Sequence, residues 1–216
     1  LFEIAKDCKA LVAGTENLLP LININPNLKM IARVGIGLDG VPLHECRKRG
    51  IKVSWTPDAV TRAVAELTLG QMVSISRFVH ELDAGIRHKE WNRPAGRGIR
   101  ESTIGLIGFG RIGTTVARLL SSFTPREILV RDIKDKTHEI QTLQKEGIKI
   151  RSAGLEELLQ NSNILSLHVP LWKKTRHMIS TLELEQMRSD AIIINTARGG
   201  IIDEVALEKA LERKMI

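Results

Sequence analysis

Three glycines with the spacing Gly-x-Gly-x-x-Gly stand at Gly108, Gly110 and Gly113. They follow a short apolar run, residues 103–107, and open an amphipathic stretch, residues 111–120. A strand, a glycine turn and a helix in this order can hold a phosphate. The first glycine permits the tight turn, the second lets the phosphate approach the backbone, and the third lets helix and strand pack closely. Because a helix N-terminus favours an anion, the pattern predicts a pyrophosphate site.

A carboxylate follows the next apolar run. Residues 128–131 read as a strand that leads into Asp132, nineteen positions after Gly113. In dinucleotide-binding folds an acid about 20 residues beyond the glycines accepts hydrogen bonds from the adenosine ribose and repels a 2′-phosphate. Asp132 therefore predicts NAD rather than NADP as the cofactor, although the neighbouring Arg131 could attract a phosphate.

Two further polar segments follow apolar runs. The segment Asn195–Gly200 comes after the run 191–194, and a guanidinium at such a strand end, here Arg198, can bind a carboxylate through two parallel hydrogen bonds. On these residues alone a surface arginine before a turn is an equal alternative. His168 follows the run 164–167, where it is either a catalytic side chain or a structural one that leads the chain into Pro170.

Short apolar runs alternate with amphipathic stretches along the whole chain, which indicates an α/β fold with parallel sheets. A helix is predicted over 42–49, closed by Gly50, and one long helix over 58–80, with Asp58 as its N-cap and a polar loop over 85–102 after it. We expect a Rossmann-type doubly wound sheet in residues 58–216. Residues 1–57 are expected to be part of a second, flavodoxin-like domain that is incomplete here. Strands are predicted at 10–13, 30–32, 51–53, 103–107, 128–131, 148–150, 164–167 and 192–195.

Composition narrows the function classes. The 216 residues are 43% hydrophobic without a run of about 18 apolar residues, so no membrane span is expected. The net charge of +7 is spread along the chain, aromatic residues make up only 3% and tyrosine is absent, so we expect no nucleic-acid partner. Cys8 and Cys46 lack metal-ligand spacing, which predicts no metal and a reducing, cytoplasmic location.

Taken together, these motifs resemble the D-isomer-specific 2-hydroxyacid dehydrogenases, and most closely their phosphoglycerate dehydrogenase-like branch. The resemblance runs almost from end to end of the chain, with the motifs in the family's order. The matching segments are 26–29, 33–39, 50–53, 56–57, 63–67, 108–113, 168–170, 175–177 and 195–203.

The resemblance implies an NAD-dependent enzyme that interconverts a small D-2-hydroxy acid and its 2-oxo acid, and that is a homodimer. Arg198 matches the family's catalytic arginine, which holds the substrate carboxylate and polarises the carbonyl. The substrate loop is matched by Val34, Gly35, Ile36 and Gly37. Cofactor contacts are implied for Gly108, Gly110, Arg111, Ile112, Gly113, Asp132, His168, Val169, Pro170, Thr196, Ala197 and Arg198.

The chain also departs from the family pattern. The family's catalytic Glu and His are expected beyond Ile216, and further residues are expected before Leu1, so this chain by itself should turn over little or nothing. Trp55 and the run 58–61 differ from the usual residues beside the cleft, which leaves the substrate open, with glyoxylate, formate or phosphite as other candidates. The alternative function is a non-enzymatic, corepressor-like member of the family that senses NAD(H).

Overall fold

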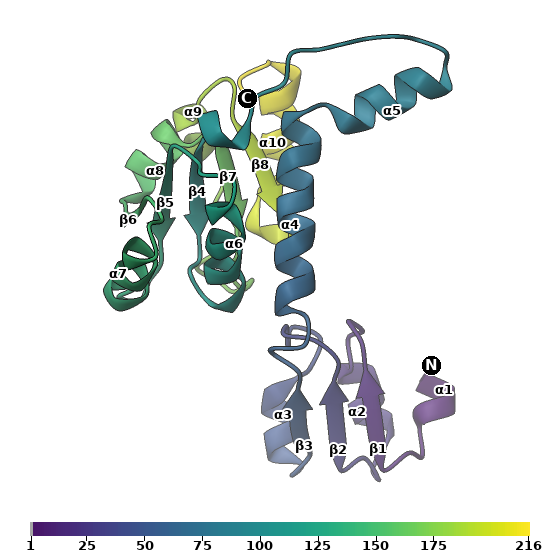
Figure 1. The fold of residues 1–216 in the computed structure, drawn as a ribbon. Coiled ribbons are helices and arrows are strands. Elements are labelled where there is room, and N and C mark those ends of the chain that lie inside the picture. The colour runs from purple at the N-terminus through teal and green to yellow at the C-terminus, as the bar shows by residue number, and fades with distance from the viewer. Residues whose placement is uncertain (1) are drawn as a thin grey trace. The chain divides into compact units, whose positions relative to one another are not determined.

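The computed structural model describes the protein from Phe2 to Ile216, the side chain of Phe2 excepted. The chain forms two compact units, of which the first ends at Thr61 and the second begins at Arg62 (Figure 1). The sequence prediction placed the domain boundary after residue 57. Within the described residues, no helix is both long and apolar enough to cross a membrane.

The first unit is a three-stranded parallel sheet with the strand order β1-β2-β3. Its apolar core includes Leu18, which directly precedes α2, Ile22 from α2, Ile31 from β2 and Cys46 from α3. At the carboxyl edge of the sheet, Arg33 ends β2 and is paired in register with Ala13 on one side and Trp55 on the other. The elements are α1 (Phe2–Ala5), β1 (Ala10–Ala13), α2 (Leu19–Ile24), β2 (Met30–Arg33), α3 (Leu43–Lys48) and β3 (Lys52–Trp55).

The second unit is built on a five-stranded parallel sheet with the order β6-β5-β4-β7-β8. Numbered along the chain within this unit, the order is 3-2-1-4-5, that of a Rossmann sheet, which confirms the predicted fold class. In such a sheet the strand order reverses beside the first strand, here β4, and ligands bind at the carboxyl ends of the strands there. The strands are β4 (Thr103–Ile107), β5 (Glu127–Arg131), β6 (Ile150–Ser152), β7 (Ile164–Leu167) and β8 (Ile192–Asn195).

Helices cover both faces of this sheet because successive strand residues point to opposite sides. On β5, Ile128 and Val130 join the core under α4, α6 and α7, whereas Leu129 joins the core under α8, α9 and α10 (Figure 1). The helices are α4 (Thr61–Ser76), α5 (Val79–Arg87), α6 (Arg111–Ser121), α7 (Thr137–Lys145), α8 (Leu155–Asn161), α9 (Thr181–Gln186) and α10 (Glu204–Glu212).

The single long helix predicted over 58–80 is wrong. It is two helices, α4 and α5, which are separated at Phe78, where φ is +55°. The chain returns to the end of α4 at residues 96–97, where the Arg97 N–H donates to the Ser76 carbonyl at 3.0 Å. This contact holds the returning segment against the last turn of α4. The helix between them, α5, extends away from the sheet and has no buried residue. Asp58 is not the N-cap residue, because α4 begins at Thr61.

Two smaller expectations also need correction. Residues 148–150 were predicted as a strand, but β6 is Ile150–Ser152. Ile148 is buried in the turn between α7 and β6, where its N–H donates to the Leu143 carbonyl at 3.0 Å. The loop predicted over 85–102 contains the end of α5 and a 3₁₀ turn, Ile99–Glu101. The strands predicted at 103–107, 164–167 and 192–195 are confirmed residue by residue.

Candidate nucleotide and substrate sites

The glycine turn joins β4 to α6 at the carboxyl edge of the sheet. Gly108 has φ +94°, and a Cβ there would lie 2.5 Å from the carbonyl oxygen of His168. A Cβ on Gly113 would lie 2.2 Å from the carbonyl oxygen of Gly108. Around Gly110, in contrast, no heavy atom lies within 4 Å of the Cβ position. Two of the three glycines are therefore required by the protein's own packing, and Gly110 leaves open space beside the turn.

The N-terminus of α6 opens onto the same space. No side chain caps this helix, and Gly110, its N-cap residue, has extended backbone. The first bond into the helix runs from the Thr114 N–H to the Gly110 carbonyl at 3.0 Å. The amide groups of Ile112 and Gly113 precede that bond, so they are available to an anion, as helix N-terminal amides commonly are. The residues present fit a pyrophosphate group.

Asp132 lies directly beside the glycine turn. Its Oδ2 accepts a hydrogen bond from the Phe109 N–H at 2.7 Å, and its Oδ1 accepts one from the Lys134 N–H at 2.9 Å. These two amides fix the orientation of the carboxylate, and each oxygen keeps a lone pair for a further donor. A pocket of about 270 Å³ runs from Asp132 along the loop after β5, with Ile133, Ile140 and Ser152 among its lining residues. A nucleoside with a free 2′-hydroxyl suits this carboxylate, whereas a 2′-phosphate would be repelled.

Replacing Asp132 by alanine is expected to weaken NADH binding by about 10- to 100-fold, the value of hydrogen bonds to a charged group, and to weaken NADPH binding much less. The dissociation constant of NADH divided by that of NADPH, both measured by fluorescence titration, should therefore rise. Asp135→Ala is the matched control, because Asp135 lies on the same loop and lines the same pocket, but among the described residues its side chain bonds only to Thr137. An unchanged NADH to NADPH ratio in Asp132→Ala would remove the assigned role of this carboxylate.

His168 follows β7 and adjoins the turn through its backbone. Its N–H donates to the Ile107 carbonyl at 2.7 Å, and its Nε2 lies 3.0 Å from the hydroxyl of the fully buried Ser166. Burial lowers the pKa of His168 from 6.5 to about 4. The imidazole is therefore neutral at physiological pH and supplies no positive charge to a phosphate. Its backbone, rather than its ring, shapes the edge of the glycine turn.

The turn after β8 carries Arg198 at the same edge of the sheet. The Asn195 side chain holds this turn from inside, since its Nδ2 donates to the Arg198 carbonyl at 2.8 Å and its Oδ1 accepts from the Ala197 N–H at 3.1 Å. Arg198 is a partly exposed residue, and its Nη1 donates to the Ala197 carbonyl at 2.8 Å. Thr196 faces α4, where its hydroxyl oxygen lies 2.8 Å from that of Thr68.

The predicted substrate loop, residues 34–37, lies in the first unit. Val34 donates its N–H to the Ala13 carbonyl at 3.0 Å, and Gly35 donates its N–H to the Thr56 hydroxyl at 2.8 Å. The loop is thereby tied to the carboxyl ends of the strands on both sides of β2. Val34 is 57% exposed, and Ile36 and Gly37 are partly exposed, so the loop is accessible to a ligand.

Arg33 is a candidate that the sequence prediction did not single out. It ends β2, is only 7% exposed, and makes no side-chain hydrogen bond or ion pair with any described residue. Gly35, with φ +128°, gives it room, because a Cβ there would lie 2.8 Å from Nη1 of Arg33. The Arg33 nitrogens are not among the fully buried polar atoms that lack a partner, so they keep some access to solvent. A guanidinium that is exposed in part and pairs with no described residue is a candidate site for an anion. The signal in the sequence was an arginine at the end of an apolar run, the same signal that drew attention to Arg198.

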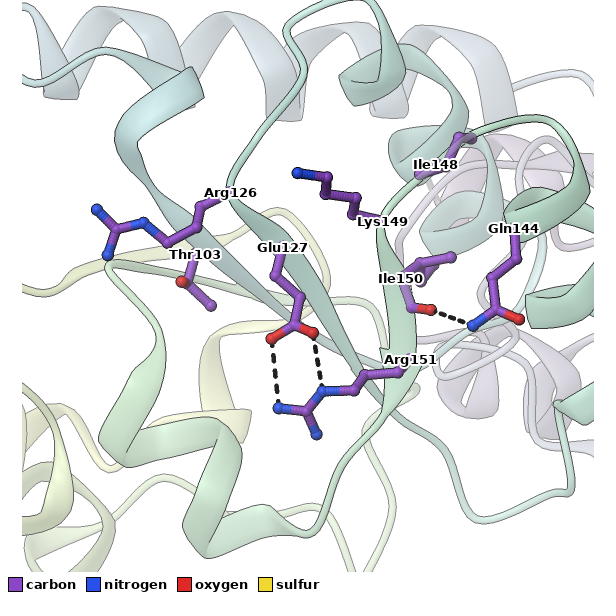
Figure 2. Close-up of a pocket in the computed structure, with 8 residues that line it drawn as sticks. All are labelled: Thr103, Arg126, Glu127, Gln144, Ile148, Lys149, Ile150 and Arg151. Atoms are coloured by element: carbon purple, nitrogen blue, oxygen red, sulfur yellow. Dashed lines mark hydrogen bonds and ion pairs between the residues drawn. The ribbon is translucent and has the colours of Figure 1, made fainter.

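A cavity of about 420 Å³ lies at the opposite edge of the second sheet, where β4, β5 and β6 begin (Figure 2). Arg151 projects into it and is held by two carboxylates: its Nε donates to Glu127 at 2.8 Å and its Nη1 to Glu157 at 2.7 Å. These carboxylates neutralise the arginine, and the cavity is away from the strand ends that carry the glycine turn. We assign this cavity no part in the candidate site.

Comparisons with known proteins agree with this geometry. A family model for the D-isomer specific 2-hydroxyacid dehydrogenase, NAD binding domain, matches residues 69–216. The chain is 40% identical over 197 residues to the glyoxylate reductase of Thermofilum pendens, covering 88% of this chain and 57% of that protein. It is 36% identical over 220 residues to the D-3-phosphoglycerate dehydrogenase of Methanocaldococcus jannaschii, covering 100% of this chain and 41% of that protein.

The fold is also that of a solved relative. The D-lactate dehydrogenase from Aquifex aeolicus, complexed with NAD and lactic acid, superposes with a TM-score of 0.87 at 28% identity, covering 100% of this chain and 64% of that one. The chain thus spans less than two thirds of the length of each of these proteins. The family match and the nucleotide-binding geometry lead to one conclusion: the chain belongs to the NAD-dependent D-isomer-specific 2-hydroxyacid dehydrogenases and contains their NAD-binding domain.

Proposed function

We propose that the full-length protein interconverts a D-2-hydroxy acid and its 2-oxo acid with NAD(H), and that its substrate carries a second acidic group, as in the phosphoglycerate dehydrogenase-like branch. Family membership supports the reaction class. The observation that carries the finer proposal is Arg33, which is only 7% exposed, pairs with no described residue and lies directly before the predicted substrate loop. A substrate that brings its own anion, such as a phosphate, would supply that partner.

Each assigned residue has a distinct chemical role. The cofactor supplies or accepts the hydride. Arg198 would bind the substrate carboxylate with its guanidinium and stabilise the negative charge that grows on the carbonyl oxygen during reduction. The proton for that oxygen needs a general acid with a pKa near the working pH. His168 is unsuited to this role because burial lowers its pKa to about 4. The family resemblance assigns the role of general acid to a Glu and His pair expected beyond Ile216.

A second candidate substrate class is the small acid without a second charge. It is favoured by the name of the Thermofilum pendens relative, glyoxylate reductase. Glyoxylate has one carboxylate, which Arg198 alone would satisfy, and Arg33 would then keep no partner. The non-enzymatic NAD(H)-sensing function is the remaining alternative, and it requires cofactor binding without turnover.

The decisive experiment is NADH oxidation by the full-length protein with phosphohydroxypyruvate, glyoxylate and pyruvate, in wild type and Arg33→Met. We expect turnover of phosphohydroxypyruvate and, in Arg33→Met, a rise of about 30-fold in its KM, since hydrogen bonds to charged groups contribute about 2 kcal/mol. The KM for glyoxylate should change less than about twofold on the same reasoning. Arg47→Met is the matched control, because Arg47 is an exposed arginine of the same unit on α3.

The other outcomes separate the alternatives. A preference for glyoxylate that is insensitive to Arg33 would replace the proposed substrate with a small mono-acid. Tight NADH binding with no turnover of any acid would favour the sensing protein and contradict the proposed enzyme.

A further inference from the structure

We infer that Thr68 on α4 is a positioning residue for Arg198: its hydroxyl holds Thr196, and through Thr196 the turn that carries the arginine. This inference rests on the proposed role of Arg198 in binding the 2-oxo acid. Thr68 and Thr196 are 128 positions apart in the sequence, and their hydroxyl oxygens lie 2.8 Å apart.

The direction of this hydrogen bond follows from counting protons. Thr68 donates its hydroxyl proton to the Val64 carbonyl, four residues earlier on α4, at 2.8 Å. A hydroxyl has one proton to give, so Thr196 must donate to Thr68. The Thr196 proton is thus directed toward the helix, and its oxygen can only accept a further bond. The side chain of Thr196 is held in one rotamer by an atom that is itself fixed.

The bond is not needed to satisfy buried groups. Thr68 is fully buried, but its bond to the Val64 carbonyl already satisfies its donor, as is common for threonine within a helix. Thr196 is partly exposed, so water can take the place of Thr68. What the bond provides is a fixed attachment of the turn to α4.

That attachment complements the bonds inside the turn. Asn195 links the Ala197 N–H and the Arg198 carbonyl, and so makes residues 195–198 a locally rigid unit. These internal bonds would be kept if the whole turn shifted. The bond from Thr196 to α4 instead fixes the place of the turn relative to a helix whose residues Ala65 and Met72 are packed in the core of the same unit. Because a displacement of about 1 Å can cost up to about 100-fold in rate, this restraint bears directly on Arg198.

The test compares Thr68→Val, which keeps the shape and removes the hydroxyl, with Thr68→Ser, which keeps the hydroxyl. In the full-length protein we expect Thr68→Val to lower kcat/KM for the 2-oxo acid by about 10-fold or more. The dissociation constant of NADH should rise by a smaller factor, because residues 196–198 are implied to contact the cofactor through their backbone. Thr68→Ser should restore kcat/KM to within about twofold of wild type. The matched control is Thr142→Val, which removes an equivalent hydroxyl bonded to the His138 carbonyl on α7.

A second measurement does not depend on activity. Hydrogen exchange of residues 195–198 should be faster by about 10-fold in Thr68→Val and unchanged in Thr142→Val, because the turn loses its attachment to α4 only in the first variant. If wild type turns over no 2-oxo acid, the proposed function fails while this exchange measurement still decides the attachment. Unchanged exchange overturns the inference. So does a full kcat/KM in Thr68→Val, or a loss that Thr68→Ser does not restore.

Discussion

Arg198→Ala is expected to lower kcat/KM of the full-length protein by about 10³-fold or more. Removing one donor that stabilises the developing oxyanion costs about 10²- to 10³-fold in rate, and Arg198 is also assigned the substrate carboxylate. The structure supports the assignment because Arg198 is partly exposed and lies on a turn at the carboxyl edge of the sheet, where Asn195 holds its backbone. Steady-state NADH oxidation with the preferred 2-oxo acid provides the measurement.

Three comparisons make this result specific. Arg198→Lys should retain part of the activity, because an ammonium keeps the charge and loses the bidentate geometry. NADH affinity should change little in either variant, since the implied cofactor contacts of residues 196–198 are made by the backbone. Arg213→Ala, an exposed arginine at the end of α10, serves as the control. An Arg198→Ala protein with more than a tenth of the wild-type kcat/KM would contradict the assigned role.

The sequence predicted best what depends on local pattern. The strands 103–107 and 164–167 are buried along their whole length, so each is a mainly apolar run with clear ends, in which Thr103 and Ser166 are the polar residues. The glycine turn and Asp132 follow the same logic, and the structure brings Asp132 to the Phe109 amide. The separation of α4 from α5 at Phe78 was not predictable from local pattern. It depends on a distant segment, because the Arg97 N–H bonds to the Ser76 carbonyl at the end of α4.

Other residues of the candidate site could be identified only from contacts between segments that are distant in the sequence. Nothing in the sequence links Thr68 with Thr196, because their bond depends on how α4 packs beside β8. Arg33 had a local signal but needed its burial and its lack of a partner to become a candidate. The assignment of residues 1–57 to a substrate domain, the homodimer and the cytoplasmic location stay predictions.

The second large effect concerns two glycines of one motif, for which we expect opposite results. Gly113→Ala places a Cβ 2.2 Å from the Gly108 carbonyl oxygen, a backbone atom that can move only if the turn distorts. Overpacking of this kind costs about 3 kcal/mol in the free energy of unfolding. For a domain of this size the melting temperature should fall by about 6 to 12 °C. Thermal unfolding without cofactor is the measurement.

Gly110→Ala, in contrast, should leave the unfolding free energy of the cofactor-free protein unchanged or raise it by up to about 1 kcal/mol, because alanine reduces the entropy of the unfolded chain. Its Cβ meets no protein atom within 4 Å, and its backbone φ of −84° suits alanine. The same Cβ would stand where the pyrophosphate has to approach the amides of α6. We therefore expect the dissociation constant of NADH to rise by about 100-fold, as clashes and lost charge-assisted bonds together imply.

Gly154→Ala provides the control that separates these effects. Gly154 precedes α8 as Gly110 precedes α6, with extended backbone and no atom within 4 Å of its Cβ position, but it is not part of the glycine turn. Gly154→Ala should have the same small effect on stability as Gly110→Ala and should leave NADH affinity unchanged. Wild-type NADH binding in Gly110→Ala would exclude the proposed pyrophosphate position, and wild-type stability in Gly113→Ala would contradict the close packing of turn and helix. Since the two variants differ by three positions in one motif, opposite results would distinguish a glycine required by the fold from one required by the ligand.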